Sequence, residues 1–277
     1  MKDMEILCRA SAFLVKAKNK TFHSKYHLLT VGHAVAPWRW PKHYPDEWLQ
    51  QVNERHTLYT VEMRHADGLF MSQSELDSDV YHHPTRDFSV LHLQDEDSVF
   101  ETLRGVGVED TVHNMPALSR GIPEFLLDGA KLVFHGHEVA NGSENSPTDD
   151  RRCLPRTVPG AIIGRTPHQI FSRTTPTLVD GMCGGPVLFD GWNGTNKSSE
   201  GSEKHMGQTV GMVEGIVPLD HPDLHLRGAA VFVETDQIRR FLDRIESGEE
   251  QPVRGGQIAS SVGSDQDPSK MDMNKFL

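Results

Sequence analysis

Short runs of β-branched and aromatic residues, separated by turn-forming residues, recur along most of this chain and restrict the folds open to it. The runs lie at 11–15, 26–31, 57–63, 88–93, 131–134, 160–163, 185–189, 210–213 and 229–233. Strands this short bury a core only when several of them pair and pack together. The pattern therefore predicts an all-β body, built as a sandwich or as barrels.

One segment near the C-terminus has helical periodicity instead, at 235–247. Its apolar side chains recur at the spacing of one helix face. They are Ile238, Phe241, Leu242 and Ile245. Thr235 can cap the start of this helix and Gly248 can end it. Residues 248–277 contain few apolar side chains, and we expect them to form a disordered tail.

Three polar stretches, 36–56, 140–158 and 191–208, are expected to be loops between strands, and the first of them could contain a short helix near Asp46. The first of them contains Trp38 and Trp40, and it also contains a third tryptophan at position 48. Aromatic residues are favoured at protein interfaces, so this stretch could form a partner-binding patch. The alternative is a small local core that packs the insertion against the body.

The composition excludes two classes of function. The chain has 277 residues, 36% of them hydrophobic, and a net charge of −11 at pH 7. Nucleic-acid phosphates are held by clustered Lys and Arg, so we expect no nucleic-acid binding through a basic patch. The sequence contains no apolar run of roughly 18 residues, and we expect no membrane partner.

The three cysteines, Cys8, Cys153 and Cys183, are too few and too scattered for a disulfide framework. Thiols that stay reduced are typical of proteins inside the cell. Asp3 and Glu5 lie where a secretory signal peptide would be basic. We therefore expect an intracellular protein in a reducing compartment, either the cytosol or an organelle matrix, and not a secreted one.

The segment 180–188, Asp-Gly-Met-Cys-Gly-Gly-Pro-Val-Leu, places Cys183 in a glycine-rich turn before an apolar run. Glycines let the backbone curl until consecutive N–H groups face one point, where they can bind the oxyanion of a tetrahedral intermediate. A cysteine in such a turn is a strong nucleophile once deprotonated. Taken alone, the segment fits a buried structural cysteine in a glycine-rich hairpin equally well.

Two other segments contain the partners that such a nucleophile needs. His33 directly follows the apolar run 28–31, where a histidine can act as general base. Asp87 opens the run 88–93, where a carboxylate can accept from the imidazole N–H and fix its tautomer. Each residue alone has an ordinary interpretation, as a surface or core histidine and as a strand cap.

Together and in this order, the segments resemble the chymotrypsin-like (trypsin-like) peptidases, and most closely their HtrA-type branch. The similar motifs lie at 29–35 (catalytic histidine), 86–91 (aspartate), 181–186 (nucleophile, with Cys in place of Ser), 211–216 (substrate-binding strand) and 228–233 (closing strand). The ordered set is much more specific than any one of its motifs.

This resemblance implies a chymotrypsin-like double β-barrel with the active site in the cleft between the barrels. We place the N-terminal barrel at 1–115 and the C-terminal barrel at 116–234. The C-terminal α-helix follows at 235–247 and the tail at 248–277.

The resemblance also assigns catalytic roles. His33 would be the general base, Asp87 would orient it, and Cys183 would attack the scissile carbonyl. The backbone N–H groups of Gly181 and Cys183 would form the oxyanion hole. A thiolate beside a protonated histidine can perform the same acyl transfer as an activated serine.

A substrate-binding surface follows from the same resemblance. Val213, Glu214 and Gly215 would pair with the substrate backbone as an added strand. Thr177 and Ala229 would line the pocket for the residue before the cleaved bond. A neutral pocket lined by small residues favours a small or medium apolar side chain at that position.

Glu214 departs from the family, which usually has a small or neutral residue at this place. A carboxylate near the triad could raise the pKa of His33 and stabilise a thiolate–imidazolium pair. It could equally mark a site that has lost its activity.

Other histidines raise the question of a metal site. The pairs lie at 82 and 83, at 135 and 137, and at 221 and 225. None has a cysteine or carboxylate at ligand spacing, so we expect exposed loop histidines, no metal and no cofactor.

The sequence thus favours a cysteine endopeptidase with a Cys-His-Asp triad, acting on polypeptide substrates through a covalent acyl-enzyme. The main alternative is a proteolytically inactive peptidase fold that serves as a scaffold or binding subunit for a protein partner. A further alternative is a redox-sensing Cys183 without turnover.

Overall fold

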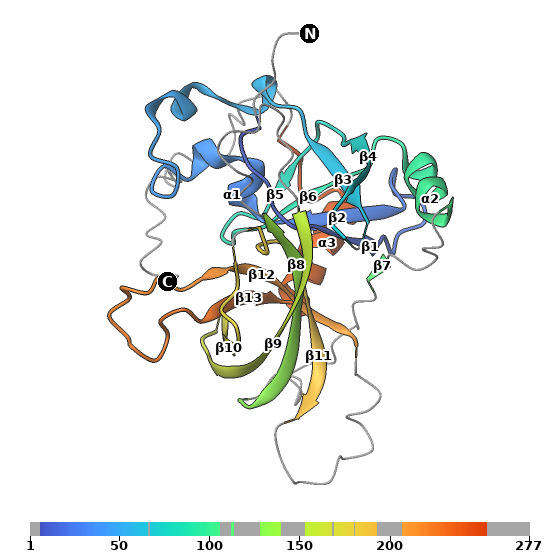
Figure 1. Ribbon diagram of the computed structural model, residues 1–277. Helices are drawn as coiled ribbons and strands as arrows, with labels where there is room; N and C mark the ends of the chain where they lie inside the picture. Colours follow the sequence, from blue (N-terminus) through green and yellow to red (C-terminus); the bar gives the residue numbers. More distant parts are fainter. Residues whose placement is uncertain are drawn as a thin grey trace.

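The structure is a computed structural model, and it describes residues 6–65, 67–105, 112–113, 128–139, 153–167, 169–179, 181–192 and 207–253. The described chain is mostly β, with a closed six-stranded barrel, a five-stranded sheet and a two-stranded hairpin. Figure 1 shows the two β regions stacked on each other, with the barrel formed by the C-terminal half. This arrangement confirms the expectation of a mostly β fold with a C-terminal helix.

The C-terminal half closes on itself. Its strands are β8 (Ala130–Val139), β9 (Cys153–Arg165), β10 (Ile170–Thr174), β11 (Pro186–Trp192), β12 (Thr209–Ile216) and β13 (Ala230–Glu234). They pair in the closed order β10-β13-β12-β11-β8-β9, and every pair is antiparallel. Phe134, Phe189 and Phe232 are fully buried in its core. Because closure pairs each strand on both sides, the barrel is a firm frame for the turns at its rim.

The N-terminal half is built differently. Its sheet has the order β5-β6-β2-β1-β7. The strands are β1 (Phe13–Lys16), β2 (Tyr26–Thr30), β5 (Tyr81–His82), β6 (Ser89–Leu91) and β7 (Val112–His113), with a separate hairpin of β3 (Thr60–Arg64) and β4 (Phe70–Glu75). A β-bridge between Leu76 and Leu93 connects the end of the hairpin to the end of β6. The part of this half that the structure describes is not a closed barrel, so the expectation of two closed barrels is met only in the C-terminal half.

The chain between β2 and β3 contains α1 (Gly32–Val35) and the expected 36–56 stretch. This stretch folds into the short 3₁₀ helices η1 (Pro37–Arg39), η2 (Glu47–Gln51) and η3 (Glu54–His56), and η2 lies where a short helix was expected, next to Asp46. Leu49 is buried, whereas Trp48 is 49% exposed. The insertion therefore buries one leucine and leaves one tryptophan at the surface.

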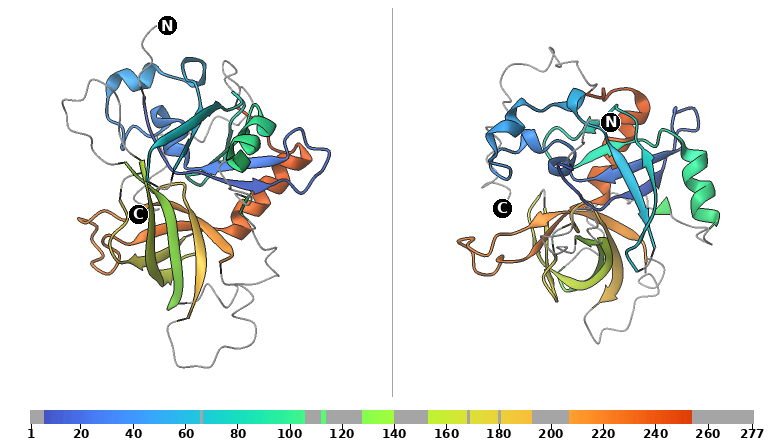
Figure 2. Two further views of the ribbon diagram at one scale, coloured as in Figure 1. Left: turned by 45° about the vertical axis from the view of Figure 1, so that its right-hand side comes forward. Right: turned by 45° about the horizontal axis from the view of Figure 1, so that its top comes forward.

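Helix α3 (Thr235–Ser247) confirms the predicted C-terminal helix. Its apolar face joins one buried cluster with Val15 of β1 and with Met212 and Val233 of the barrel. Figure 2 shows the helix at the junction of the two β regions. Gly248 ends it in the left-handed conformation, as expected, but Glu234 rather than Thr235 occupies the N-cap position.

Several expectations are corrected or fall outside the described residues. The second expected loop, 140–158, is already strand β9 from Cys153 onward. A helix that we did not predict, α2, spans Glu96–Gly105. The expected domain boundary at 115–116 and the tail beyond 253 lie outside the described part of the chain. No helix among the described residues is long and apolar enough to cross a membrane.

Candidate active site

His33 and Asp87 meet in the N-terminal half. His33 lies in α1, directly after β2, and Asp87 directly precedes the buried Phe88 and strand β6. The His33 ring Nδ1 lies 2.5 Å from Oδ2 of Asp87, and the His33 backbone N–H donates to Oδ1 over 2.8 Å. Gly32 permits this approach, because a β-carbon there would lie 3.0 Å from the Asp87 carboxylate. The carboxylate therefore fixes both the backbone and the ring of the histidine.

Cys183 lies in the turn that leads into β11, and its neighbouring glycines are required by geometry. Gly181 and Gly184 have φ angles of 93° and 86°, a region that favours glycine. A β-carbon at Gly184 would lie 2.1 Å from the carbonyl oxygen of Ser11, and one at Gly185 would lie 2.0 Å from that of His135. The turn can take this shape only with glycine at these positions.

The structure brings Cys183 and His33 together across the two halves. The two side chains line the same cavity, and the Cys183 thiol is close enough to the His33 ring to raise its pKa. Since Nδ1 of His33 faces Asp87, the ring nitrogen left for Cys183 is Nε2. Burial lowers the pKa of His33, but the charge and hydrogen bond of Asp87 and the contact with Cys183 outweigh burial and raise that pKa well above its ordinary value. The imidazole thus has a carboxylate on one side and a thiol on the other.

The backbone around the expected oxyanion hole is fixed in part by one hydrogen bond of the turn. The Met182 carbonyl accepts from the N–H of Gly185. In a trans peptide the C=O and N–H point in opposite directions, so the Cys183 N–H is directed away from that bond. Neither this N–H nor that of Gly181 donates to an acceptor in the described part of the chain. Both donors are therefore available to an oxyanion.

Ser11 holds the turn from behind, a role that sequence reasoning missed. Its N–H donates to the carbonyls of Gly181 and Cys183, each over 2.9 Å, and its hydroxyl donates to Gly181 over 2.7 Å. The same hydroxyl accepts from the His137 N–H, and the Ser11 carbonyl accepts from the Thr30 hydroxyl. Ser11 thus connects the nucleophile turn to β2 and β8. The only sequence signal was its place in the first β-prone run.

A cavity of about 230 Å³ opens beside the triad. It is lined by Cys8, Arg9, His33, Tyr44, Val179, Gly181, Cys183 and Ile216. Sequence analysis did not identify Cys8, Arg9 or Tyr44 as site residues, because nothing in the sequence places the N-terminal segment or the 36–56 insertion near the triad. The Cys8 sulfur lies 3.3 Å from the Tyr44 hydroxyl. Burial and the neighbouring Cys8 raise the pKa of Tyr44, so the phenol is neutral.

The insertion also places aromatic rings around the general base. The rings of Trp40 and Tyr44 lie 6.4 Å from the His33 ring, and that of His43 lies 6.2 Å away and nearly parallel to it. Burial and the positive charge of His33 lower the pKa of His43. His43, Trp40 and Tyr44 thus surround the His33 ring with aromatic side chains.

The expected substrate-binding residues are more scattered than the triad. Thr177 is exposed, and Ala229 is fully buried in a cluster with Phe171, Val217 and Val231. Neither of the two lines the cavity beside Cys183, where Val179 and Ile216 form the apolar wall.

Strand β12 contacts the Cys183 turn through its backbone and the Asp87 segment through one side chain. Both backbone groups of Val213 bond to the nucleophile turn, since its carbonyl accepts from Gly184 and its N–H donates to Gly185. The Glu214 carboxylate bonds to Arg86 and to the Asp87 N–H. The backbone groups of Val213 are thus used within the protein, whereas the Glu214 contacts involve only its side chain, so the expected pairing of Glu214 with a substrate backbone stays a prediction. Gly215 retains that expected role.

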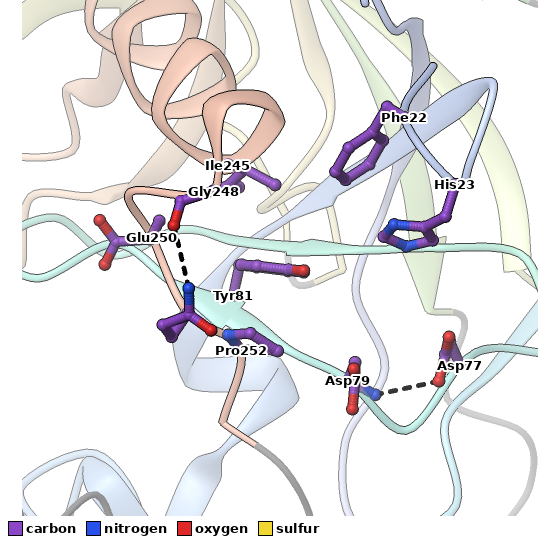
Figure 3. A pocket seen from close by; sticks show the side chains of 10 residues that line it. Phe22, His23, Asp77, Asp79, Tyr81, Ile245, Gly248, Glu250 and Pro252 are labelled. Carbon is purple, nitrogen blue, oxygen red and sulfur yellow. Dashed lines mark hydrogen bonds between the residues drawn. The ribbon is translucent and has the colours of Figure 1, made fainter. Parts of the chain in front are cut away.

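A second cavity, of about 320 Å³, lies near the end of α3 (Figure 3). Its walls include Phe22, His23, Asp77, Tyr81 and Glu250. It contains none of the triad residues. No group of three His, Cys, Asp or Glu side chains in the described part of the chain is arranged to hold a metal ion.

No known family model and no curated protein matches this sequence. Solved structures with a similar fold include the HtrA-type protease AlgW with a decapeptide, at 13% identity and a TM-score of 0.48. AlgW with a tripeptide matches at 12% identity and a TM-score of 0.49, and Rv3671c from M. tuberculosis H37Rv, in an inactive form, matches at 12% and 0.46.

These alignments cover 85%, 87% and 90% of this chain, respectively. The chain spans about half of the AlgW chains, 51% and 56% of their length, and 86% of the Rv3671c chain. These are similarities in fold, and the chemistry of the site follows from the contacts of this chain's own residues.

Proposed function

We propose that this protein is a cysteine endopeptidase of trypsin-like fold, with Cys183 as nucleophile. The observation that carries the proposal is the position of the His33 ring, which is hydrogen-bonded to Asp87 and lines one cavity together with Cys183. A nucleophile beside a base, and a group that orients the base, are the elements of nucleophilic acyl transfer.

The first half of the reaction forms a thioester. Nε2 of His33 accepts the proton of the Cys183 thiol, and the thiolate attacks the carbonyl carbon of the scissile peptide. The N–H groups of Gly181 and Cys183 stabilise the oxyanion. When the C–N bond breaks, the protonated His33 donates its proton to the leaving amine. The raised pKa of His33 supports this step, since the imidazolium persists until the amine departs.

The second half of the reaction releases the product. His33, now neutral, takes a proton from a water molecule that attacks the thioester carbon. The resulting tetrahedral intermediate expels the Cys183 thiolate, which recovers the proton from His33, and the carboxylic acid product leaves. No cofactor or metal takes part in either half, and a thiol nucleophile suits the reducing intracellular compartment inferred from the sequence.

The substrate in this proposal is a polypeptide with a small or medium apolar residue before the cleaved bond. Val179 and Ile216 form the apolar part of a cavity of about 230 Å³, which is large enough for one such side chain and offers it apolar contacts. Gly215 is the residue of β12 that we assign to pairing with the substrate backbone.

The test combines a thiol-reactive peptide probe with cleavage profiling of a peptide library. We expect labelling at Cys183 that depends on His33, and cleavage that is abolished by both Cys183→Ala and His33→Ala. Cys8→Ser is the control, because Cys8 lines the same cavity but bonds to the Tyr44 hydroxyl rather than to His33. Labelling that is unchanged in His33→Ala, with no cleavage of any peptide, would overturn the proposal.

The alternative function is a binding scaffold, and one observation favours it. Residues Cys8 and Arg9 of the protein's own N-terminal segment form part of the cavity wall beside Cys183. A segment in this place narrows the access of a polypeptide to the nucleophile. Under this alternative Cys183 is either inert or an oxidation sensor, and the cleavage assay separates both cases from the peptidase.

A further inference from the structure

Strand β12 has an irregularity at Glu214 that redirects its side chain. In the pairing of β12 with β13, Val213 is opposite Phe232 and Gly215 is opposite Val231. Glu214 is the additional residue between them, and it has no partner in that register. Such β-bulges turn a side chain out of its regular alternation and are frequent next to active sites.

The redirected carboxylate contacts the segment that contains Asp87. Arg86 donates from Nη2 to Glu214 over 2.6 Å, and the Asp87 backbone N–H donates to the other carboxylate oxygen over 3.1 Å. The pair is buried, with 4% of the Arg86 side chain and 10% of the Glu214 side chain exposed. A buried ion pair whose partner is removed leaves an uncompensated charge, so each of the two residues depends on the other.

The charges around the Arg86–Glu214 pair indicate how the pair acts on Asp87. Glu214 is faced by Arg86, Asp87 and Gln169, and Arg86 is faced by Glu214, Asp87 and Glu234. Three carboxylates therefore face one guanidinium, and Glu214 is the one that bonds to it. As long as Glu214 holds Arg86, the charge of Asp87 remains directed to His33. Without Glu214, the carboxylates of Asp87 and Glu234 are the ones left to attract the guanidinium.

We propose that Glu214 and Arg86 are positioning residues, which fix Asp87 against His33 and keep the Arg86 guanidinium from competing for its carboxylate. This proposal rests on the proposed function. The same strand acts on the nucleophile as well, because Val213 bonds to Gly184 and Gly185 immediately after Cys183. Residues 213 and 214 of β12 thus set the nucleophile turn and the Asp87 segment relative to each other.

The first test is Glu214→Gln in the full chain, with two readouts. We expect kcat for a cleaved peptide to fall about 10²-fold while KM changes less than about threefold, because a misplaced catalytic group slows the reaction without weakening binding. The second readout is the titration midpoint of the His33 ring, followed by NMR and assigned with His33→Gln. We expect this midpoint to fall by about one pH unit, since Glu214→Gln removes a negative charge and frees Arg86 to approach Asp87.

Two further variants distinguish positioning from general stability. Glu54→Gln is the matched control, since Glu54 pairs with Arg39 at 2.9 Å and its side chain is also 10% exposed. It should leave both kcat and the His33 midpoint unchanged. The double variant Glu214→Gln/Arg86→Met removes both buried charges, which proteins often tolerate. It should move the His33 midpoint back toward the wild-type value.

The results separate the two proposals. A His33 midpoint and a kcat that are both unchanged in Glu214→Gln would overturn the positioning role, as would a double variant with the same midpoint as the single one. If wild-type protein cleaves nothing but the His33 midpoint shifts as described, the positioning role holds and the proposed peptidase function fails.

Discussion

The proposed nucleophile and the proposed base lie in two halves of the molecule, which hold these residues by different kinds of contact. Cys183 lies on the rim of a closed barrel, and backbone hydrogen bonds from Ser11 and Val213 fix its turn. His33 and Asp87 lie in a half whose sheet is not closed in the described residues, and side-chain contacts fix them. We therefore expect the Cys183 turn to be sensitive to substitutions that add volume. His33 and Asp87 should be more sensitive to substitutions that change a charge.

The two halves also differ in what they bury. The barrel core is apolar and contains three phenylalanines. The N-terminal half buries histidines: His27 and His92 bond to each other at 3.0 Å, and His27 also bonds to Glu246 of α3. Burial lowers the pKa of both histidines, that of His92 to about 3. The half that holds the catalytic base should therefore be the more sensitive to acid.

The largest effect is expected from Asp87→Asn. An amide cannot supply the negative charge opposite Nδ1 of His33, and its NH₂ group favours the wrong imidazole tautomer. We expect kcat to fall about 10³- to 10⁴-fold with little loss of stability. Peptide cleavage kinetics measure this, with Asp77→Asn as the control aspartate outside the triad. Activity within tenfold of wild type would show that Asp87 does not orient the base.

Gly184→Ala tests the nucleophile side of the comparison. The new β-carbon would lie 2.1 Å from the Ser11 carbonyl oxygen at a φ of 86°. We expect a loss of about 2–5 kcal/mol in the free energy of unfolding, measured with urea, together with loss of activity. Gly191→Ala is the control, because Gly191 also has a positive φ but nothing lies within 4 Å of its added β-carbon. Equal losses in both variants would mean that close packing is not what requires Gly184.

Acid should destabilise the N-terminal half through its buried histidines. A histidine with a lowered pKa binds fewer protons in the folded than in the unfolded state, so its contribution to stability is present above pH 6.5 and is lost as the pH falls toward its folded pKa. For His92, with a folded pKa of about 3, we expect a loss of about 2 kcal/mol between pH 6.5 and 4. His33 has the opposite sign: its contribution is present below pH 6.5 and is lost as the pH rises through its raised pKa.

The variant His92→Gln keeps a hydrogen-bond partner for His27 but does not titrate. Its urea-unfolding free energy should decrease less between pH 6.5 and 4 than that of wild type. His225→Gln, at an exposed histidine, should retain the wild-type pH dependence. If the unfolding free energy falls equally with pH in wild type and in His92→Gln, His92 is not a source of acid sensitivity.

The smallest effect is expected from Ser11→Ala. The substitution removes the hydroxyl that donates to Gly181 and accepts from His137, at an expected cost of about 1–2 kcal/mol in unfolding free energy. Ser24→Ala removes another buried serine hydroxyl, one that bonds to Tyr26 and Glu96. Both variants should lose similar stability, but only Ser11→Ala should lower kcat, by about tenfold. Equal kcat values in Ser11→Ala and Ser24→Ala would show that the Ser11 hydroxyl does not support the turn that contains Gly181 and Cys183.

The local parts of this architecture could be predicted from the sequence. The spacing of Ile238, Phe241 and Leu242 predicted α3, because one helix face is a short-range pattern. The strand-adjacent positions of His33 and Asp87 could be identified because each follows or precedes an apolar run. What could not be predicted depends on contacts between distant segments. Ser11 supports Gly181 across 170 positions, and no local signal indicates such a bond.

The role of Glu214 could not be predicted from the sequence for the same reason. In the sequence it is one carboxylate in an apolar strand, and a regular strand would direct it by simple alternation. The bulge between Val213 and Gly215 alters that direction, and the buried Arg86 then determines its role. The sequence also did not reveal that the C-terminal half closes into a barrel whereas the described residues of the N-terminal half do not, since both halves contain β-prone runs of similar length.

The most direct test of the site is to trap its covalent intermediate. Wild-type protein would be mixed with a nitrophenyl ester of an N-acylated small apolar amino acid, quenched in acid, digested and analysed by mass spectrometry. We predict an acyl group in thioester linkage to Cys183, absent from Cys183→Ala and strongly reduced in His33→Ala. Acylation that is equal with and without His33, or that occurs on Cys8 instead of Cys183, would contradict a catalytic triad at this site.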